Sequence, residues 1–420
     1  MLERPRRHMS VVLGLFLVAF AGCGSEDRVT QPLPPDTEFK TISPTGVIEY
    51  DGEQLRPVCM DGSAYHFFAK RGSVNKLLMY YQGGGACWEQ LTCGLRVCDT
   101  SVEPDGEDNP NNYDSGFADL SNPANPFREW HIVFVPYCSC DIHFGDAAQD
   151  YTNTDPQNPV HVEHRGYHNA RVAEKYAREK FPDPEEVFVT GSSAGAYGAW
   201  FQSLYLHEAF PNAHFNVLAD AGNGVITQDF VENYFPNWNF AANLVTSIPG
   251  VGAAMESGSI VAYTKAVADY YPDTRWAHYT TAFDGGQGGQ TGFYNVMLND
   301  NQPAAALTWW NGSCAFNDQM RAQAQQTYEA VHATEPDNYR YYIGTGSRHT
   351  MWGSNKVYSD TTGGVPTIVD WVNAMLSGSA EWANVECTNP GLTLPGDPQP
   401  NPLQSPFEQV GQDVKIVCPD

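Results

Sequence analysis

The sequence is poor in basic side chains. It holds 23 Lys and Arg against 49 Asp and Glu, which gives a formal net charge of -26 over 420 residues. A surface this acidic repels phosphate backbones and anionic lipid headgroups, so we expect no nucleic-acid partner. Hydrophobic residues make up 42% of the chain and aromatic residues 13%. This composition is enough to bury a large core and predicts one large folded domain.

The sequence also has little that could span a membrane. The apolar run Val11–Phe20 follows Arg4, Arg6 and Arg7, and it is shorter than the ~20 residues that a membrane-spanning helix needs. A basic start followed by a short apolar run is typical of an export signal. We therefore assign residues 1–22 to a signal peptide.

A cysteine directly follows this segment and offers a lipidation site. Phe20-Ala21-Gly22-Cys23 is similar to the end of a bacterial lipoprotein signal, although Phe20 stands where Leu is usual. The alternative is an ordinary secretory signal that leaves Cys23 as a plain thiol. In both cases we expect an exported protein, either membrane-anchored in the periplasm or at the cell surface, or secreted. Residues 23–40 then form a flexible tether, residues 41–420 form the domain, and a Pro-rich tail starts near residue 388.

Cysteine and histidine pairs with the spacing of a zinc site are missing. The one tight pair, Cys138 and Cys140, is too closely spaced for a zinc knuckle, so we expect disulfides and no metal. With Cys23 lipidated, nine of the ten cysteines remain. An odd number allows at most four bridges and one free thiol, and a bridge from Cys418 would hold the tail. The acidic stretch Glu103–Gly116 lacks the ligand spacing of a calcium loop and is expected to be a solvated loop.

Strand-like and helix-like segments alternate along the domain. Apolar, β-prone runs cover 76–82, 131–137, 186–190, 214–219, 276–283 and 338–344. Helical spacing covers 166–180, 194–209 and 318–332. This alternation predicts an α/β fold with a mostly parallel sheet and helices on both faces.

A candidate nucleophile lies between a predicted strand and a predicted helix. Gly191-Ser192-Ser193-Ala194-Gly195 fits Gly-x-Ser-x-Gly, in which small residues allow a sharp turn that exposes the serine hydroxyl. The bare pattern occurs often by chance. The β-prone run before it and the helical spacing after it make a satisfied serine in a plain turn the weaker interpretation. We take Ser193 as the nucleophile of an α/β-hydrolase fold.

A serine needs a base, which in this fold follows later in the chain, in the order Ser, acid, His. His349 follows the strand predicted to be the last, whereas His207, His214, His278 and His332 lie within predicted helices or strands. We therefore assign His349 as the base.

Two carboxylates could be the acid because each follows a strand between nucleophile and base. Asp220 follows the first strand after Ser193 and Asp284 follows the next. The acid more often follows the second of these strands. Asp284 is therefore preferred, and Asp220 then becomes a structural carboxylate that bonds to loop amides near the site.

An oxyanion hole requires preorganised N–H groups. Ala194 supplies one from the nucleophile turn, and the glycines of Gly83-Gly84-Gly85, which follow a predicted strand, let the backbone approach a substrate closely. Cys87 and Cys93 flank the next turn, and a bridge between them would fix Gly84 and Gly85.

Taken together, these segments resemble the pectin acetylesterase family, which includes the Notum carboxylesterases. The matching pieces, in family order, are Gly83 to Cys87 with Cys93, Val135 to Cys138 with Asp141, Gly191 to Gly195, Asp220 to Gly222, Phe283-Asp284 with Gln287, and His349. The resemblance implies an α/β-hydrolase fold, no cofactor, and a triad of Ser193, Asp284 and His349. It also implies that Gly84, Gly85 and Ala194 donate to the oxyanion. Gly85 and Ala86 stand where the family usually has an aromatic residue, so the resemblance does not specify the pocket wall or the acyl group that it accepts.

The expected function is hydrolysis of acyl esters, with acetyl esters on a polysaccharide as the first candidate. A monomer that acts on an acylated small molecule or polysaccharide is expected. Pectin is a polyanion and would be repelled by so acidic a protein, so neutral acetylated polysaccharides or hydrophobic esters fit better. The alternatives are an esterase or lipase for longer acyl chains, an inactive carbohydrate-binding protein, and a serine peptidase on the same fold.

Overall fold

The structure is a computed structural model, and it describes residues 33–334, 337–401, 407–410 and 413–418. The expected signal peptide and the lipidation site Cys23 lie outside the described residues. The description of the fold below concerns the unit that begins at Pro35.

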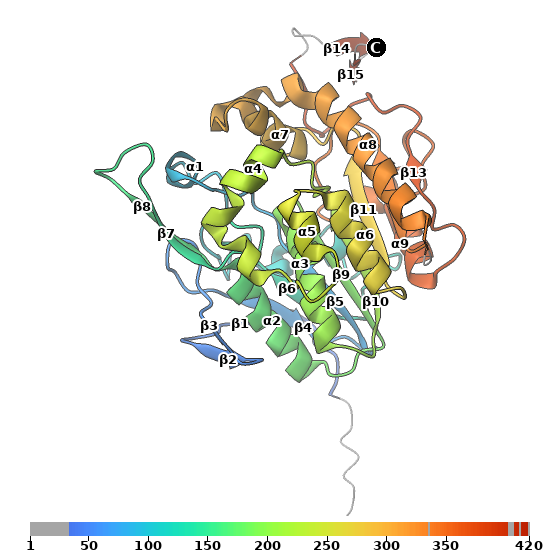
Figure 1. The fold of residues 1–420 in the computed structure, drawn as a ribbon. Helices are drawn as coiled ribbons and strands as arrows, with labels where there is room; N and C mark the ends of the chain where they lie inside the picture. Colours follow the sequence, from blue (N-terminus) through green and yellow to red (C-terminus); the bar gives the residue numbers. More distant parts are fainter. Residues whose placement is uncertain (1–32, 335–336, 402–406, 411–412, 419–420) are drawn as a thin grey trace, which may run out of the picture. The chain divides into compact units, whose positions relative to one another are not determined.

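A large mixed sheet forms the centre of the domain (Figure 1). Its nine strands, in spatial order, are β1 (Lys40–Ile42), β4 (Phe67–Lys70), β6 (His131–Val135), β5 (Lys76–Tyr81), β9 (Glu186–Ser192), β10 (His214–Asp220), β11 (Arg275–Thr281), β12 (Tyr339–Gly344) and β13 (Val385–Glu386). All pairs from β6 to β13 are parallel, whereas β1 and β4 are joined antiparallel at one edge. The central strands are continuous apolar runs because both of their faces are covered. The predicted parallel sheet is confirmed.

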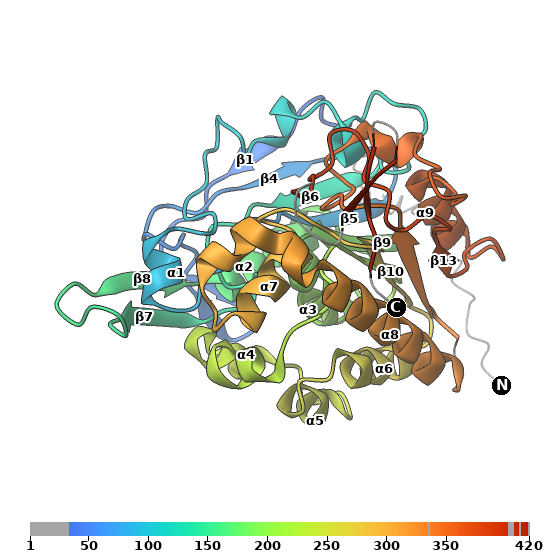
Figure 2. The same ribbon diagram turned by 90° about the horizontal axis from the view of Figure 1, so that it is seen from above.

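Helices cover both faces of this sheet (Figure 2). They are α1 (Gln90–Gly94), α2 (Gly166–Lys180), α3 (Ala194–Ala209), α4 (Gln228–Asn233), α5 (Val251–Glu256), α6 (Ile260–Tyr270), α7 (Gln290–Leu298), α8 (Ser313–His332) and α9 (Ile368–Ser377). Successive residues of a strand point to opposite faces. Tyr341 of β12 contacts Tyr328 of α8, and Tyr342 contacts Trp371 of α9, so α8 and α9 lie on opposite faces. The α/β-hydrolase arrangement of one domain is confirmed.

Predicted and observed element boundaries agree best around the nucleophile. The helices α2 and α3 have the predicted bounds, and β9 and β10 run slightly further than predicted. The strand β11 ends at Thr281 because the chain turns there toward Asp284, whose φ is 33°. The strand β12 is not the last of the sheet, since β13 pairs with it.

The connection from β10 to β11 carries an insertion that the sequence pattern did not reveal. It contains α4, α5, α6 and two short 3₁₀ turns, Phe235–Trp238 and Phe240–Asn243. Buried aromatic side chains hold it together, as in the contacts of Phe235 with Trp238 and Phe240. The 3₁₀ turns and the six-residue helices α4 and α5 are too short to show an apolar period, whereas the 11-residue helix α6 was missed although it is long enough to show one.

Three small antiparallel pairs complete the described strands. They are β2 (Ile48–Tyr50) with β3 (Glu53–Leu55), β7 (Ala147–Tyr151) with β8 (Val160–His164), and β14 (Phe407–Val410) with β15 (Asp413–Ile416). The β7–β8 hairpin extends away from the large sheet in both views (Figures 1 and 2). Within the described residues, no helix is both long enough and apolar enough to cross a membrane.

Disulfides link the loops around the sheet. The pairs are Cys59–Cys138, Cys87–Cys93, Cys98–Cys140 and Cys314–Cys418. Cys387 is buried and is the free thiol of the described chain. Four bridges and one thiol match the count expected for nine cysteines, and the predicted Cys87–Cys93 bridge is confirmed. Disulfides on this scale fit an exported protein.

Candidate active site

Ser193 lies in the tight turn between β9 and α3. Its φ of 57° and ψ of -122° are a strained conformation for a residue with a side chain. Such strain is expected where a turn holds a nucleophile out of the sheet. The Ser193 N–H donates to the Asp220 carbonyl at 2.8 Å, which fastens the turn to the neighbouring strand β10.

The turn is possible only because the chain passes very close to itself. A Cβ on Gly195 would lie 2.0 Å from the Tyr81 carbonyl oxygen, and one on Gly83 would lie 2.5 Å from the Ser192 carbonyl oxygen. Both distances are far below van der Waals contact. Glycine therefore lets the end of β5 and the loop after it approach the serine.

His349 lies in the loop after β12, and Asp284 holds its imidazole. The distance from His349 Nδ1 to Asp284 Oδ1 is 2.6 Å. The other ring nitrogen, Nε2, is buried and has no hydrogen-bond partner among the described residues. Ser193 and His349 line the same cavity. The structure thus brings together the predicted nucleophile, base and preferred acid.

Further hydrogen bonds fix the Asp284 carboxylate, which is fully buried. The N–H and side-chain amide of Gln290, at the start of α7, donate to its two oxygens at 2.9 and 2.7 Å. The Thr280 hydroxyl also donates to it at 3.3 Å. A carboxylate with so many donors is held in one orientation.

The pKa of His349 reflects two opposing influences. Burial lowers it, but the charge and hydrogen bond of Asp284 and the charge of Asp220 outweigh burial, so the pKa is raised above 6.5. Stabilising the protonated imidazole is what a general base needs during proton transfer.

Asp220 makes no hydrogen bond to the histidine ring. Its buried carboxylate accepts hydrogen bonds from the Ser192 hydroxyl and from the N–H groups of Met351 and Trp352. Burial raises the pKa of Asp220 to about 6, although these hydrogen bonds lower it. This is the pattern of bonds to loop amides that the sequence predicted for it.

The glycine loop lies against two other loops. The Asp99 N–H donates to the Gly84 carbonyl at 2.9 Å, and Gly85 forms a β-bridge with Cys98. Ala194 is the first residue of α3, so its N–H has no partner inside the helix. Gly85 and Ala194 line the cavity together with Ser193. Gly84 precedes Gly85 in the chain but does not itself line the cavity.

The cavity has a volume of about 340 Å³ and mostly apolar walls. Its apolar lining residues include Ala86, Trp88, Val97, Ile142, Val225, Ile226, Phe230, Phe235, Trp238, Phe293, Val296, Pro303, Ala306 and Leu307. Most of these walls were missed in the sequence, because they come from the insertion, from α7 and from the 3₁₀ segment Pro303–Gly312 that follows it. The one available signal was the density of aromatic residues in Asn233 to Phe240.

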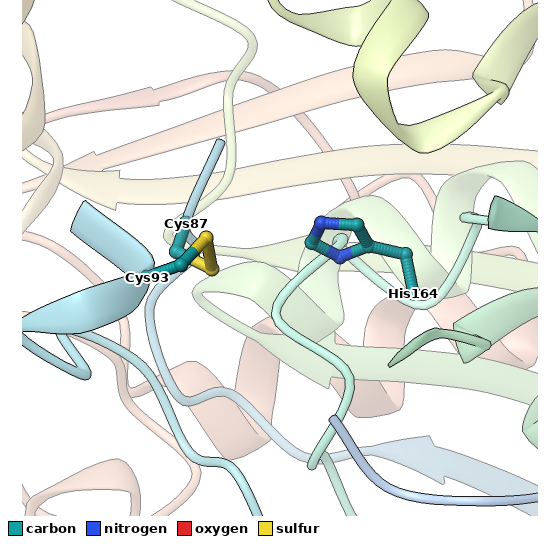
Figure 3. A group of neighbouring side chains, drawn as sticks. All are labelled: Cys87, Cys93 and His164. Carbon is teal, nitrogen blue, oxygen red and sulfur yellow. A yellow bond between two sulfur atoms is a disulfide. The ribbon is translucent and has the colours of Figure 1, made fainter. Parts of the chain in front are cut away.

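Two groups of side chains bring metal-type ligand atoms close together. They are Cys87, Cys93 and His164, and Cys87, Cys98 and Cys140. All of these sulfurs are in disulfides, and Figure 3 shows the bond between Cys87 and Cys93 beside the His164 ring. The two ring nitrogens of His164 lie within hydrogen-bond distance of the Tyr151 hydroxyl and the Ser139 carbonyl. These groups therefore brace loops and offer no free ligand atom.

Comparison with known proteins assigns the chain to a family. A model of the pectinacetylesterase family matches residues 49–258, which is half of the chain. The chain belongs to the pectinacetylesterase family. The match begins before the glycine loop, includes the nucleophile turn and ends inside the insertion.

The chain is also similar to two Notum proteins. Palmitoleoyl-protein carboxylesterase notum2 of Xenopus laevis is 24% identical over 144 residues, which are 33% of this chain and 28% of that protein. The chain therefore matches less than a third of that relative's length. The structure of the Wnt deacylase Notum from Drosophila superposes with a TM-score of 0.54 at 15% identity, covering 78% of this chain and 92% of that one. The fold is Notum-like, and family membership supports hydrolase activity of the esterase or deacylase type.

Proposed function

We propose that the protein is a serine carboxylesterase that forms an acyl-enzyme. The observation that carries this proposal is the location of Ser193 and His349 on one cavity, with the imidazole held by Asp284 at 2.6 Å. A carbohydrate-binding protein has no need for this combination of features. They are a strained serine, a buried imidazole with one nitrogen unbonded, and a carboxylate that holds the imidazole.

In the proposed reaction, Ser193 Oγ attacks the ester carbonyl carbon while its proton passes to His349 Nε2. The carbonyl oxygen becomes an oxyanion that accepts hydrogen bonds from the N–H groups of Ala194, Gly85 and Gly84. Collapse of this intermediate breaks the ester bond, and the alcohol leaves with the proton from Nε2. Water then repeats the sequence, with His349 as base, and releases the acid.

The apolar cavity supports an acyl group longer than acetyl. Its volume lies in the range of small-molecule sites, and an acetyl group would fill only a small part of it. Gly85, Ala86 and Trp88 all line it, so the small residues at the glycine loop open the cavity while Trp88 forms part of its wall. The similar Xenopus protein is named for a palmitoleoyl-protein substrate, which also carries a long acyl chain. We infer that the substrate is a hydrophobic acyl ester.

A series of p-nitrophenyl esters tests both parts of the proposal. Because each buried methylene contributes about 0.8 kcal/mol, kcat/KM should rise from acetate through butyrate to octanoate. A fluorophosphonate probe should label the native protein and Ser121→Ala, whose serine is exposed, and should fail to label Ser193→Ala. Fastest turnover of acetate would return the assignment to an acetylesterase. Normal turnover by Ser193→Ala would refute the esterase proposal itself.

A further inference from the structure

A second buried carboxylate connects the two halves of the site. Asp220 is the last residue of β10 and its side chain is fully buried. The Ser192 hydroxyl donates to Oδ2 at 2.6 Å. The Met351 N–H donates to both oxygens at 3.0 Å, and the Trp352 N–H donates to Oδ2 at 3.3 Å. The carboxylate thus binds donors from two separate segments.

These donors are the immediate neighbours of the two reacting side chains. Ser192 precedes Ser193, and Met351 and Trp352 follow His349 by two and three residues. The main chain of Asp220 adds a fourth donor, because its carbonyl accepts the Ser193 N–H. One residue therefore bonds directly to the nucleophile turn and to the loop of the base.

Neighbouring side chains strengthen this arrangement. The Tyr80 hydroxyl of β5 lies 2.9 Å from the Ser192 hydroxyl, and both are buried. The Trp352 indole N–H donates to the Thr190 hydroxyl of β9 at 2.9 Å. The loop that contains His349 and Trp352 is therefore hydrogen-bonded to the end of β9 as well as to β10.

The charge of Asp220 also acts on His349. It raises the pKa of the imidazole in addition to Asp284, which is in direct contact with the ring. Burial raises the pKa values of the Tyr80 and Tyr279 hydroxyls, and the charge of Asp220 raises them further. Both tyrosines are neutral over the working pH range. Asp220 is therefore the second negative charge that the imidazole experiences.

We propose that Asp220 is a positioning residue that holds Ser193 and His349 in register. This inference rests on the proposed function. It differs from the role of the acid, because Asp220 makes no hydrogen bond to the imidazole and acts through Ser192, the Ser193 N–H and the backbone that follows His349. Its loss should therefore impair the reaction and leave binding in the apolar cavity unchanged, since Asp220 does not line that cavity.

Asp220→Asn tests this, because the change keeps the side-chain volume and removes the charge. The amide oxygen can take the place of Oδ2, which accepts from all three donors, but the amide NH2 then lies where Oδ1 accepts the Met351 N–H, so two donors face each other. We expect kcat to fall about tenfold to a hundredfold, with KM for the octanoate ester within twofold of the native value. The acid limb of the kcat/KM profile should move to lower pH, because the imidazole loses a favourable charge.

Ser192→Ala provides the matched variant, since it removes one donor and leaves the Asp220 charge in place. Its kcat should fall by less than that of Asp220→Asn, and its acid limb should stay at the native pH. If Asp220→Asn does not fold, Ser192→Ala still tests the positioning role, and a native kcat in that variant would overturn it.

An unshifted acid limb in folded Asp220→Asn would refute the effect on His349. A native kcat would refute the positioning role. Failure of the proposed function would be seen separately, as absence of ester turnover and of fluorophosphonate labelling in the native protein.

Discussion

The two sides of the candidate site are held by different means. Ser193, Asp284 and His349 follow the ends of the parallel strands β9, β11 and β12, and buried hydrogen bonds fix them. The glycine loop on the other side has no regular structure after β5 and is braced by covalent links.

The disulfides lie directly around that loop. Cys87–Cys93 closes the turn that follows Gly85, and Cys98–Cys140 joins two segments that both bond to the loop. Cys98 pairs with Gly85, and the Cys140 carbonyl accepts the Cys87 N–H. A sheet positions side chains through its register, whereas an irregular loop needs cross-links to hold backbone N–H groups in place. The two sides should therefore respond differently to mutation and to reduction.

Asp284→Asn should have the largest effect among the changes that compare the two sides. It removes the carboxylate that orients and stabilises the His349 imidazolium, and a comparable change in a serine protease costs about 10⁴-fold in kcat. The measurement is kcat for the best ester of the series. Asp273→Asn, an exposed carboxylate just before β11, is the control and should retain native turnover. A loss below about tenfold would mean that another group supports the base.

The sequence was most informative where chemistry and fold coincide. The bounds of α2 and α3, the parallel strands and the turn at Ser193 follow from period and from small residues. The choice between Asp220 and Asp284 stayed a preference, because both follow strands at the same sheet edge. Only the three-dimensional structure shows that Asp284 contacts His349.

The cavity walls could not be predicted, for a physical reason. Phe230 and Trp238 come from the insertion, Phe293 from α7, and Leu307 from a 3₁₀ segment. These segments are distant in sequence, and no local period specifies how they meet. Burial of aromatic side chains against each other is a tertiary effect.

Removing the Cys87–Cys93 bridge should separate activity from stability. The double change of both cysteines to Ala frees the turn after Gly85, and kcat should fall about tenfold to a hundredfold as the oxyanion donors lose their alignment. The closed loop is short, with a separation of 6 residues, so the free energy of unfolding should fall by only about 2 kcal/mol.

The Cys314–Cys418 bridge is the matched control: Cys87 lies between Ala86 and Trp88, which line the cavity, whereas no residue next to Cys314 lines it. Its separation is 104 residues, for which loss of the bridge should cost about 4.7 kcal/mol of stability. Its removal should leave kcat unchanged. Equal effects of the two removals on kcat would contradict the idea that the first bridge aligns the glycine loop.

The pH profile examines the sheet side alone. Activity requires neutral His349, and its pKa is raised above 6.5. Turnover should therefore be lost as the pH falls through a value above 6.5. In Asp284→Asn the acid limb of the residual activity should lie at a lower pH, because the main charge that raises the pKa of the imidazole is gone. An acid limb at the native pH in that variant would mean that a group other than Asp284 raises the pKa of His349.

Charge is the second difference between the two sides. Seven acidic residues and no basic ones lie between residues 97 and 127, which follow the glycine loop. A Cβ on Gly84 would lie 2.2 Å from the Asp99 carboxylate, so this charge lies directly against the loop. Burial and the charges of Asp108 and Glu107 raise the pKa of Asp99 to about 6. Above pH 7 it is mostly ionised and should repel anionic substrates.

The smallest expected effect is therefore on the preference for neutral over anionic substrates. At pH 8 and low salt, turnover of acetylated xylan should exceed that of acetylated pectin. Salt should narrow the gap because it screens charges beyond about 8 Å. Asp99→Asn should narrow the low-salt gap by roughly fivefold or less, since a unit charge at 4 Å contributes about 1 kcal/mol in water. Asp183→Asn removes a charge of the same sign before the start of β9, whereas Ser193 follows the end of that strand. This variant should leave the difference in turnover unchanged. A preference for pectin at low salt would instead favour the family's namesake activity.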